Sequence, residues 1–561
     1  MTQQHDLLRW YEANLPPHER KMRGHFSTPP RLVEQILDAC GYTPDRDLSQ
    51  IRVLDPACGS GNFLTGATQR LLTWGQHNNL SATRQARNLE RNLWGFDPDP
   101  IACTLAELQM RTAFTERYPK SKALQRLHIH QADGLAFRWE NHANVDLFLA
   151  NPPYLAAKNN DLSGYRTTHQ RGQLDSYLLF LSLGLQIVRP HGWIGLVLPD
   201  PVLARANAMR ERQRLLEETT IHHIWHLADV FAAYVGAVVI VAQKTPPHQQ
   251  HHIFWERARW SERQTIQAEV AKNMPAMVSR TVSQHLLRNQ PGTELRYLLS
   301  TIEGTLLERL HRQYCSHISG KLVYLGECVF IRRGEELGKD SSFLRTQPPE
   351  STEQTWYPLL RGGIDIRPYG IPVAKYWIER QHIIKPLERY LTPKLLLVKS
   401  AGQLKATLDL QGYVVLQTLY VLHLNQSNLN QQQTEKHKFS LEDELYFLLA
   451  LLNSRLLQEY IYVLYTAYKW VQPQIEQHVL AQLPIPIHAP TIEKRQIIQR
   501  ARQMMQACSP STAVVELDVQ RYELYEEQER AISSLYEGAL QERPGMHGAY
   551  PDIDEGVSLY G

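Results

Sequence analysis

The sequence has few cysteines, little net charge and no long apolar run, and each shortage argues against a class of protein. Its six cysteines are scattered without a Cys-x-x-Cys pair, which disfavours a zinc ribbon or a disulfide-exchange enzyme. No apolar stretch approaches the roughly 20 residues that a membrane-spanning helix needs. The first six residues lack the basic and then apolar order of a signal peptide. We therefore expect a soluble intracellular protein with reduced cysteines and no metal site.

Size and composition predict several globular domains. The chain has 561 residues, of which 43% are hydrophobic, enough for two to four domains of about 150 residues each. Its 60 basic and 57 acidic residues leave a formal charge of +3. This balance permits nucleic-acid binding without indicating it, because a polyanion needs only a local basic surface. The partner must therefore be argued from motifs.

The N-terminal half alternates short apolar runs with helical patterns. Four runs predict strands that end in polar or glycine-rich turns, at residues 51–54, 92–96, 127–130 and 145–150. A helix at 176–188 and strands at 193–198 and 237–243 complete the predicted sheet. In a parallel sheet of this kind ligands bind beyond the carboxyl ends of the strands. We therefore predict an α/β, Rossmann-like, doubly wound domain.

A glycine-rich loop, residues 55–63, follows the first predicted strand and precedes a helix. Gly59 and Gly61 allow unusual backbone torsions and a close approach to a ligand. Asp55 at the strand end can accept a hydrogen bond from an amine or ammonium group, such as the one in S-adenosylmethionine. We expect Cys58 in this loop to be a packing residue, since a cofactor loop needs no nucleophile.

Two further acids follow later strands. Asp97 could accept from the ribose hydroxyls of a nucleoside cofactor, and Asp133 could accept from its adenine amino group. Either acid alone could equally be a helix cap. Their positions after the glycine loop favour cofactor binding, because one βαβ step later is where such folds place the ribose-binding acid.

The turn Asn151-Pro152-Pro153-Tyr154 follows the fourth predicted strand. Proline fixes φ and lacks an N–H, and Pro153 keeps Pro152 extended. The side-chain carbonyl of Asn151 and the backbone carbonyl of Pro152 can then accept both hydrogens of a substrate NH₂ group, while Tyr154 offers a face for stacking. The alternative is an ordinary proline-rich loop. The turn, taken with the glycine loop, predicts methyl transfer to an amino nitrogen on a flat π-system.

Beyond residue 244 the pattern changes to short β-like runs, polar turns and then helices. We expect His248, His251 and His252 in a proline-rich boundary stretch to be solvated and not to bind metal. Five segments are predicted: a leader helix at 1–22, a catalytic domain at 23–245, a linker or helical connector at 246–320, a mixed α/β recognition domain at 321–490 and a C-terminal helical segment at 491–561.

In order and spacing these motifs resemble the gamma-class, TaqI-like DNA adenine-N6 methyltransferases. The resemblance spans most of residues 20–245, and its motifs within that range include residues 26–30 and 229–231. It implies that S-adenosylmethionine is bound by Thr28, Asp55, Ala57, Gly59, Gly61, Asp97, Asp133 and Asn151. It further implies that Asn151, Pro152, Pro153 and Tyr154 hold a flipped adenine, on which Tyr154 and Phe231 stack.

The second half resembles the C-terminal target-recognition domain of the same family. The matching stretches are residues 325–334, 360–366, 394–396, 451–455 and 483–486. The resemblance implies contact with double-stranded DNA. The candidates for phosphate or guanine contacts are Arg332, Arg333, Arg361 and Arg367.

The implied function is methylation of adenine N6 at a specific site in duplex DNA, in a restriction-modification or related defence system. The implied location is the cytoplasm of a bacterium or archaeon, at the nucleoid. Methylation of cytosine N4, RNA or a glutamine amide, and a non-catalytic DNA-binding subunit, remain open alternatives. Since about 20 residues precede the first motif and no acidic pair is followed by Glu-x-Lys, we expect no nuclease domain and a possible separate restriction endonuclease partner.

Overall fold

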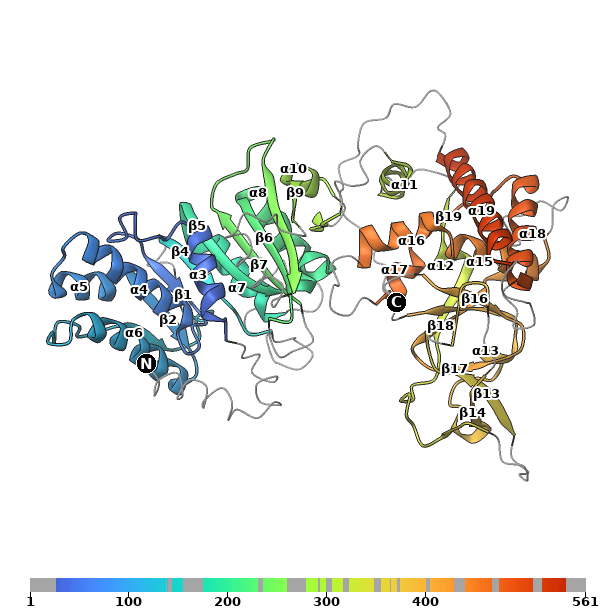
Figure 1. The fold of residues 1–561 in the computed structure, drawn as a ribbon, viewed down its shortest axis with the longest axis horizontal. Coiled ribbons are helices and arrows are strands. Elements are labelled where there is room, and N and C mark those ends of the chain that lie inside the picture. Colours follow the sequence, from blue (N-terminus) through green and yellow to red (C-terminus); the bar gives the residue numbers. More distant parts are fainter. Residues whose placement is uncertain are drawn as a thin grey trace. The chain divides into compact units, whose positions relative to one another are not determined.

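The computed structural model forms two compact units (Figure 1). It describes residues 27–137, 139, 144–154, 175–230, 236–259, 279–290, 293–298, 305–315, 322–347, 355–363, 365–370, 374–399, 404–427, 439–466, 474–507 and 517–540. The first unit comprises Met1–Thr301 and Tyr462–Gln474, and the second comprises Ile302–Ile461 and Ile475–Gly561. The leader helix expected at 1–22 lies outside the described residues. None of the described helices has the length and apolar composition to cross a membrane.

A nine-stranded sheet in the order β3-β2-β1-β4-β5-β7-β6-β8-β9 forms the centre of the first unit. Its strands are β1 (Val53–Asp55), β2 (Leu93–Asp97), β3 (His128–Gln131), β4 (Val145–Ala150), β5 (Val188–Pro199), β6 (Thr220–Ala228), β7 (Ala237–Gln243), β8 (His252–Arg259) and β9 (Ser279–Ser283). The five strands from β3 to β5 are parallel, and β7 runs antiparallel to both β5 and β6. The predicted α/β, doubly wound fold class is confirmed.

Helices cover both faces of this sheet. They are α3 (Pro30–Ala39), α4 (Asn62–His77), α5 (Ala82–Asn92), α6 (Pro100–Arg117), α7 (Ser176–Ile187), α8 (Met209–Glu218) and α10 (Gln284–Arg288). Leu147 and Leu149 of β4 belong to the apolar core that also contains buried residues of α3 to α6. Phe148, between them, meets α7 instead, because a Cβ at Gly184 would lie 3.0 Å from its ring. Successive side chains of a strand point to opposite faces, so α7 covers the face opposite α3.

The first unit continues beyond residue 245, where the sequence places the end of the catalytic domain. Strands β8 and β9 extend the sheet, with β8 parallel to β6 and β9 antiparallel to β8. A segment from far along the chain, Tyr462–Thr466, also belongs to this unit and is a single π-helical turn. Part of the expected connector at 246–320 is therefore sheet.

The second unit combines two four-stranded sheets with helices. One sheet has the order β11-β18-β15-β16 and the other β12-β14-β13-β17, and a small ladder pairs β10 with β19. The strands are β10 (Val323–Tyr324), β11 (Val329–Arg333), β12 (Leu344–Arg345), β13 (Trp356–Leu360), β14 (Tyr376–Glu379), β15 (Lys394–Val398), β16 (Ala406–Asp409), β17 (Val414–Val415), β18 (Leu419–Leu424) and β19 (Pro484–Ile485). The helices are α11 (Leu306–Cys315), α12 (Leu325–Cys328), α13 (Glu388–Leu391), α15 (Leu441–Leu452), α16 (Arg455–Ile461), α17 (Gln477–Ala481), α18 (Thr491–Ala507) and α19 (Leu517–Leu540).

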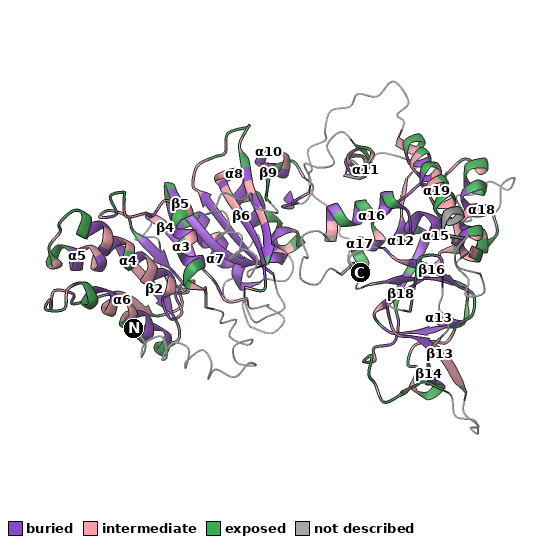
Figure 2. Cartoon of the chain, in the orientation of Figure 1, coloured by how far each residue is buried: buried purple, intermediate pink, exposed green. Residues whose placement is uncertain are grey.

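The central strands of the second unit are buried (Figure 2). Lys394 of β15 lies opposite Asp409 of β16, and the two form an ion pair of 2.5 Å with both side chains fully buried. The backbone carbonyl of Tyr390 also accepts from Lys394. Paired and hydrogen-bonded charges of this kind are tolerated in a core because each compensates the desolvation of the other. With two four-stranded sheets and several helices, the second unit has the mixed α/β character expected for this half of the chain.

Candidate active site

The loops that follow β1, β2 and β3 meet at the carboxyl edge of the sheet. The Gly59 amide donates to Asp97 Oδ2 at 3.0 Å, and the Ala132 amide donates to the Asp97 backbone carbonyl at 3.0 Å. A Cβ at Gly134 would lie 2.2 Å from the Pro56 carbonyl oxygen. The structure therefore brings together three of the loops from which the sequence predicts cofactor contacts.

The glycine loop turns sharply into α4 at Gly61. This residue has φ of +89°, and a Cβ on it would lie 2.6 Å from the Ala106 Cβ of α6. Glycine is needed here for both reasons, since an L side chain rarely adopts this torsion and has no room. Within the described chain no side chain caps this end of α4. The loop backbone therefore lies close against α6 and leaves helical amides available at its start.

Asp55 is a buried carboxylate at the end of β1, with only 1% of its surface exposed. Its Oδ1 accepts from the Ala57 amide at 3.1 Å, and in the described part of the chain no basic side chain forms an ion pair with it. Burial, with a smaller contribution from the Asp97 carboxylate, raises the pKa of Asp55 to about 8. Such a site favours a cationic ligand, because a nearby positive charge would stabilise the ionised form.

Asp97 and Asp133 each hold backbone amides of their own loops. Asp97, 8% exposed, accepts from the Asp99 amide at 2.9 Å in addition to the Gly59 amide. Asp133 is half-buried, and its Oδ1 accepts from the Leu135 amide at 2.9 Å. Each therefore has a structural contact within the loops, but Asp97 does not have the helix-cap role that the sequence left open, because the N-cap residue of α6 is Asp99.

An aromatic cluster supports the loop after β3. The ring centroids of Phe96 and Phe137 lie 4.8 Å apart, and those of Phe137 and Trp139 lie 4.7 Å apart. Trp139 Nε1 donates to the Gly134 carbonyl at 2.9 Å. Sequence reasoning missed this support. Its only signal was an aromatic pair shortly after Asp133.

The Asn151–Tyr154 turn extends directly from β4. The Tyr154 hydroxyl donates to Asn151 Oδ1 at 3.3 Å and lies 3.5 Å from the Val197 carbonyl of β5. Burial and the Asp200 carboxylate raise the pKa of Tyr154, so its hydroxyl stays protonated. Tyr154 therefore orients the Asn151 carboxamide, a contact that the sequence reasoning did not foresee when it assigned Tyr154 to stacking.

Two other predicted residues, Thr28 and Phe231, have different outcomes. Thr28 does not cap α3, because Pro29 is the N-cap residue and makes no side-chain cap bond. The Thr28 carbonyl instead accepts from Asn62 Nδ2 at 2.8 Å, which joins this segment to the start of α4. The candidate stacking residue Phe231 lies outside the described residues.

Cys58 and two histidines of the predicted boundary stretch, His251 and His252, lie among the described residues. Burial, with the nearby Asp55 and Asp97 carboxylates, raises the pKa of the Cys58 thiol well above its usual value, so a reactive thiolate is disfavoured. No group of three or more potential metal ligands occurs among the residues that the structure describes. His251 instead bonds the Ile221 carbonyl through Nε2 at 2.7 Å, and His252 begins β8.

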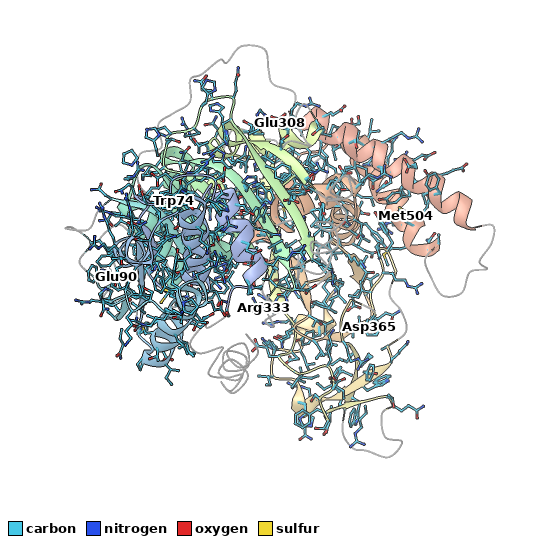
Figure 3. The ribbon with its side chains drawn as sticks, turned by 60° about the vertical axis from the view of Figure 1, so that its left-hand side comes forward. Trp74, Glu90, Glu308, Arg333, Asp365 and Met504 are labelled. Carbon is cyan, nitrogen blue, oxygen red and sulfur yellow. The ribbon has the colours of Figure 1, made fainter. Side chains whose placement is uncertain are left out.

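The four candidate DNA-contacting arginines lie in two separate regions of the second unit, Arg332 and Arg333 in β11 and Arg361 and Arg367 in the segment after β13. Arg332 and Arg333 are exposed at the end of β11, and Arg333 is labelled in Figure 3. Arg361 follows β13 and lies over the Tyr376 ring at 3.7 Å, whereas Arg367 is exposed. Asp365, also labelled in Figure 3, accepts from the Arg361 amide at 2.6 Å. The contact with Tyr376 gives Arg361 a structural role of its own.

Comparison with known proteins finds two domains in the order that the sequence predicts. Residues 3–274 match the N-6 DNA methylase family, and residues 357–485 match the TaqI-like C-terminal specificity domain. Type II methyltransferase M.XhoI of Xanthomonas vasicola is 28% identical over 226 residues, which cover 37% of this chain and 40% of the relative. Type II methyltransferase M.PaeR7I of Pseudomonas aeruginosa is 29% identical over 196 residues, 32% of each chain. The matched region therefore spans well under two thirds of either relative.

Two solved structures share the fold over most of the chain. The Type IIL restriction-modification enzyme MmeI in complex with DNA has a TM-score of 0.57 and 11% identity, with 95% of this chain and 79% of that chain covered. The DrdV–DNA complex has a TM-score of 0.51 and 15% identity, with 91% and 60% covered. At such identities the likeness shows the fold alone. Both domain matches occur in the expected order, so this chain is similar to the N-6 DNA methylases in its N-terminal part and to the TaqI-like C-terminal specificity domain in its second half.

Proposed function

We propose that this protein is a site-specific DNA methyltransferase that transfers the methyl group of S-adenosylmethionine to the N6 amino group of adenine in duplex DNA. The observation that carries the proposal is the Asn151–Tyr154 turn at the end of β4, beside the acid-lined loops that follow β1 to β3. The match of residues 3–274 to the N-6 DNA methylase family supports the same reaction. The names of relatives, which include Type II methyltransferases and a Type I methylase subunit of Escherichia coli, support a role in restriction and modification.

The residues present fit S-adenosylmethionine. Asp55 is a buried carboxylate that lacks an ion-pair partner in the described chain, which suits the ammonium group. Ala57, Gly59 and Gly61 form a loop in which glycine allows close backbone approach. When bound, the sulfonium supplies an activated methyl group and a good leaving group. The protein therefore needs to bind and orient its substrates, without providing a nucleophile or a metal.

The remaining cofactor contacts would come from the neighbouring loops. Asp97 would accept from the ribose hydroxyls and Asp133 from the adenine amino group, since an ionised carboxylate is an acceptor with about four lone-pair sites. Thr28 would lie near the cofactor, since its carbonyl is joined to the start of α4 by Asn62.

The pH dependence of cofactor affinity follows from the Asp55 carboxyl. With a pKa raised to about 8, Asp55 is mostly protonated at pH 6 to 7 and must lose its proton to face an ammonium group. We expect affinity for S-adenosylmethionine to rise with pH in this interval, by up to about tenfold per pH unit. Isothermal titration in buffers of different ionisation enthalpy would measure both the affinity and the released proton.

Asp55→Asn provides the control, because it removes the titrating group and should flatten this pH dependence. The stability of the free protein changes with pH in the opposite direction to cofactor affinity. A carboxyl whose folded pKa is raised stabilises the free protein below its usual pKa near 4, and this contribution is lost as pH rises towards 8. An affinity that is constant between pH 6 and 7 would contradict the assignment of Asp55.

The target base would be held by the Asn151–Tyr154 turn. An adenine inside a duplex must swing out of the stack, at a cost of a few kcal/mol. The Asn151 side-chain carbonyl and the Pro152 carbonyl would then accept the two N6 hydrogens, which directs the nitrogen lone pair towards the methyl group. Tyr154 and Phe231 would stack on the ring, and such stacking is worth about 1–3 kcal/mol per base. The proton released after transfer would leave through the accepting oxygens to water.

The second unit would read the DNA sequence. Arg332, Arg333 and Arg367 present exposed guanidinium groups that can contact phosphates or guanine edges. A separate restriction endonuclease that cuts the same unmethylated site would be the natural partner of such an enzyme. We propose that this protein and such an endonuclease both act on DNA in the cytoplasm.

The function can be tested in cells by expressing the protein with a plasmid and sequencing the plasmid by a method that detects modified bases directly. We expect N6-methyladenine at one recurring sequence, absent with the Asn151→Ala variant. N4-methylcytosine in its place would keep the amino-methylation chemistry and overturn the choice of base. An unmodified plasmid would contradict the proposed DNA substrate.

A further inference from the structure

The start of α7 is bonded directly to the catalytic turn. The Ser176 hydroxyl donates to the backbone carbonyl of Pro153, and Ser176 is 2% exposed. Neither Pro152 nor Pro153 has an amide hydrogen, so these two residues cannot donate backbone hydrogen bonds that would hold the turn. A hydrogen bond accepted by the Pro153 carbonyl therefore restrains the orientation of the peptide that links Pro153 to Tyr154.

Ser176 itself sits on a rigid support. Its neighbour Asp175 is 4% exposed, and Asp175 Oδ2 accepts from Asn207 Nδ2 at 3.2 Å and lies 3.5 Å from Arg205 Nη1. Both partners belong to the segment that follows β5, which contains the 3₁₀ turns at Asp200–Leu203 and Ala206–Ala208. The start of α7 is thus tied to the loop beyond the neighbouring strand.

That segment is in turn held by a buried arginine of α8. Arg212 is fully buried and donates from Nη1 to the Val202 carbonyl at 3.0 Å and to the Arg205 carbonyl at 2.7 Å. Its Nε also donates to the Thr293 carbonyl at 3.2 Å. The Arg212 guanidinium thus donates three hydrogen bonds to backbone carbonyls, and these bonds restrain the segment after β5 that contacts Asp175.

We propose that Ser176 is a positioning residue for methyl transfer, acting through Pro153 on the orientation of the catalytic turn. This inference rests on the proposed function. The Pro153 carbonyl fixes the peptide that carries Tyr154, and the Tyr154 hydroxyl orients the Asn151 carboxamide. Loss of the serine donor would let the turn rotate, which misaligns the two oxygens that receive the amino group. Misplacement by about 1 Å can cost about 100-fold in rate.

The test compares three serine variants in single-turnover methylation and in binding. Ser176→Ala removes the donor, Ser176→Thr retains a hydroxyl, and Ser182→Ala is the matched control. Ser182 lies on the same helix, and its hydroxyl accepts from Arg214 Nη1 at 3.1 Å without contact to the turn. We expect Ser176→Ala to lower kcat at least about tenfold with KM and cofactor Kd within about twofold of wild type, Ser176→Thr to recover part of the rate, and Ser182→Ala to match wild type.

A second readout does not depend on any substrate. Tyr154 carries the first backbone amide after Asn151, so its hydrogen exchange reports directly on the turn. We expect faster exchange at Tyr154 in Ser176→Ala than in Ser182→Ala, measured by mass spectrometry with fragmentation at residue resolution. Unchanged exchange, or a Ser176→Ala rate within twofold of wild type, would overturn the inference. If wild type methylated no DNA, the proposed function would fail, and the exchange comparison would still decide the role of Ser176.

Discussion

Replacing Asn151 with alanine is expected to lower kcat for methyl transfer by on the order of 10²–10³-fold. The physical reason is the loss of a preorganised acceptor for the substrate amino group, and removal of one preorganised hydrogen-bond donor from an oxyanion hole costs this much in other enzymes. The variant keeps both prolines and therefore the shape of the turn. Affinity for unmethylated DNA should stay within a few-fold of wild type. Single-turnover kinetics combined with equilibrium binding would separate the two effects.

Two further variants make this result specific. Asn151→Ser retains a shorter oxygen acceptor and should keep more activity than Asn151→Ala. Asn78→Ala removes an asparagine at the end of α4, whose side chain donates to the Trp74 carbonyl at 2.8 Å, far along the helix from its active-site end. It should leave kcat unchanged. If Asn151→Ala retained turnover near that of wild type, the role proposed for the turn would be wrong.

Replacing Asp97 with alanine should weaken binding of S-adenosylmethionine about 100-fold or more. One cause is direct, since the carboxylate proposed to accept from the ribose is gone. A second cause is indirect, because Asp97 also accepts from the amides of Gly59 and Asp99 and so shapes the glycine loop. Hydrogen bonds to charged groups contribute about 1.5–3 kcal/mol each, so the free energy of unfolding should fall as well. Titration calorimetry and chemical denaturation would measure both quantities.

The neighbouring aspartate supplies the control for this experiment. Asp99 caps α6, where its Oδ1 accepts from the Ile101 amide at 2.8 Å. Asp99→Ala should cost about 1 kcal/mol of stability through loss of the cap and leave cofactor affinity almost unchanged. Equal losses of cofactor affinity in Asp97→Ala and Asp99→Ala would contradict a ribose-binding role for Asp97, since both would then act only through the loop.

The sequence predicted the sheet well where strands are short and apolar. The predicted strand at 145–150 matches β4 to the residue, and the predicted strands before Asp55, Asp97 and Asp133 lie within two residues of β1 to β3. Such runs have a strong local signal, because both faces of a parallel sheet are buried. Strands β6 and β8 gave no comparable signal. Strand β6 contains three histidines, and β8 contains Glu256, Arg257 and Arg259, of which only Arg257 is buried.

In the site too, some features could be predicted from the sequence and others could not. The sequence could predict that the loops after β1 to β3 share one edge of the sheet, because the carboxyl ends of parallel strands lie together. The contacts that support these loops could not. Ser176 is 23 residues from Pro153, and Trp139 bonds Gly134 only because the aromatic cluster folds beneath the loop. Contacts of this kind depend on tertiary packing, which leaves no periodic pattern in the sequence.

The most direct test of the account is to identify the methylated product. Purified protein would be incubated with tritium-labelled S-adenosylmethionine and unmethylated duplex DNA, which is then digested to nucleosides and separated. The account predicts label in N6-methyldeoxyadenosine, lost with Asn151→Ala and retained with Asn78→Ala. Label in a cytosine derivative, or label only in RNA or protein supplied as alternative substrates, would contradict it.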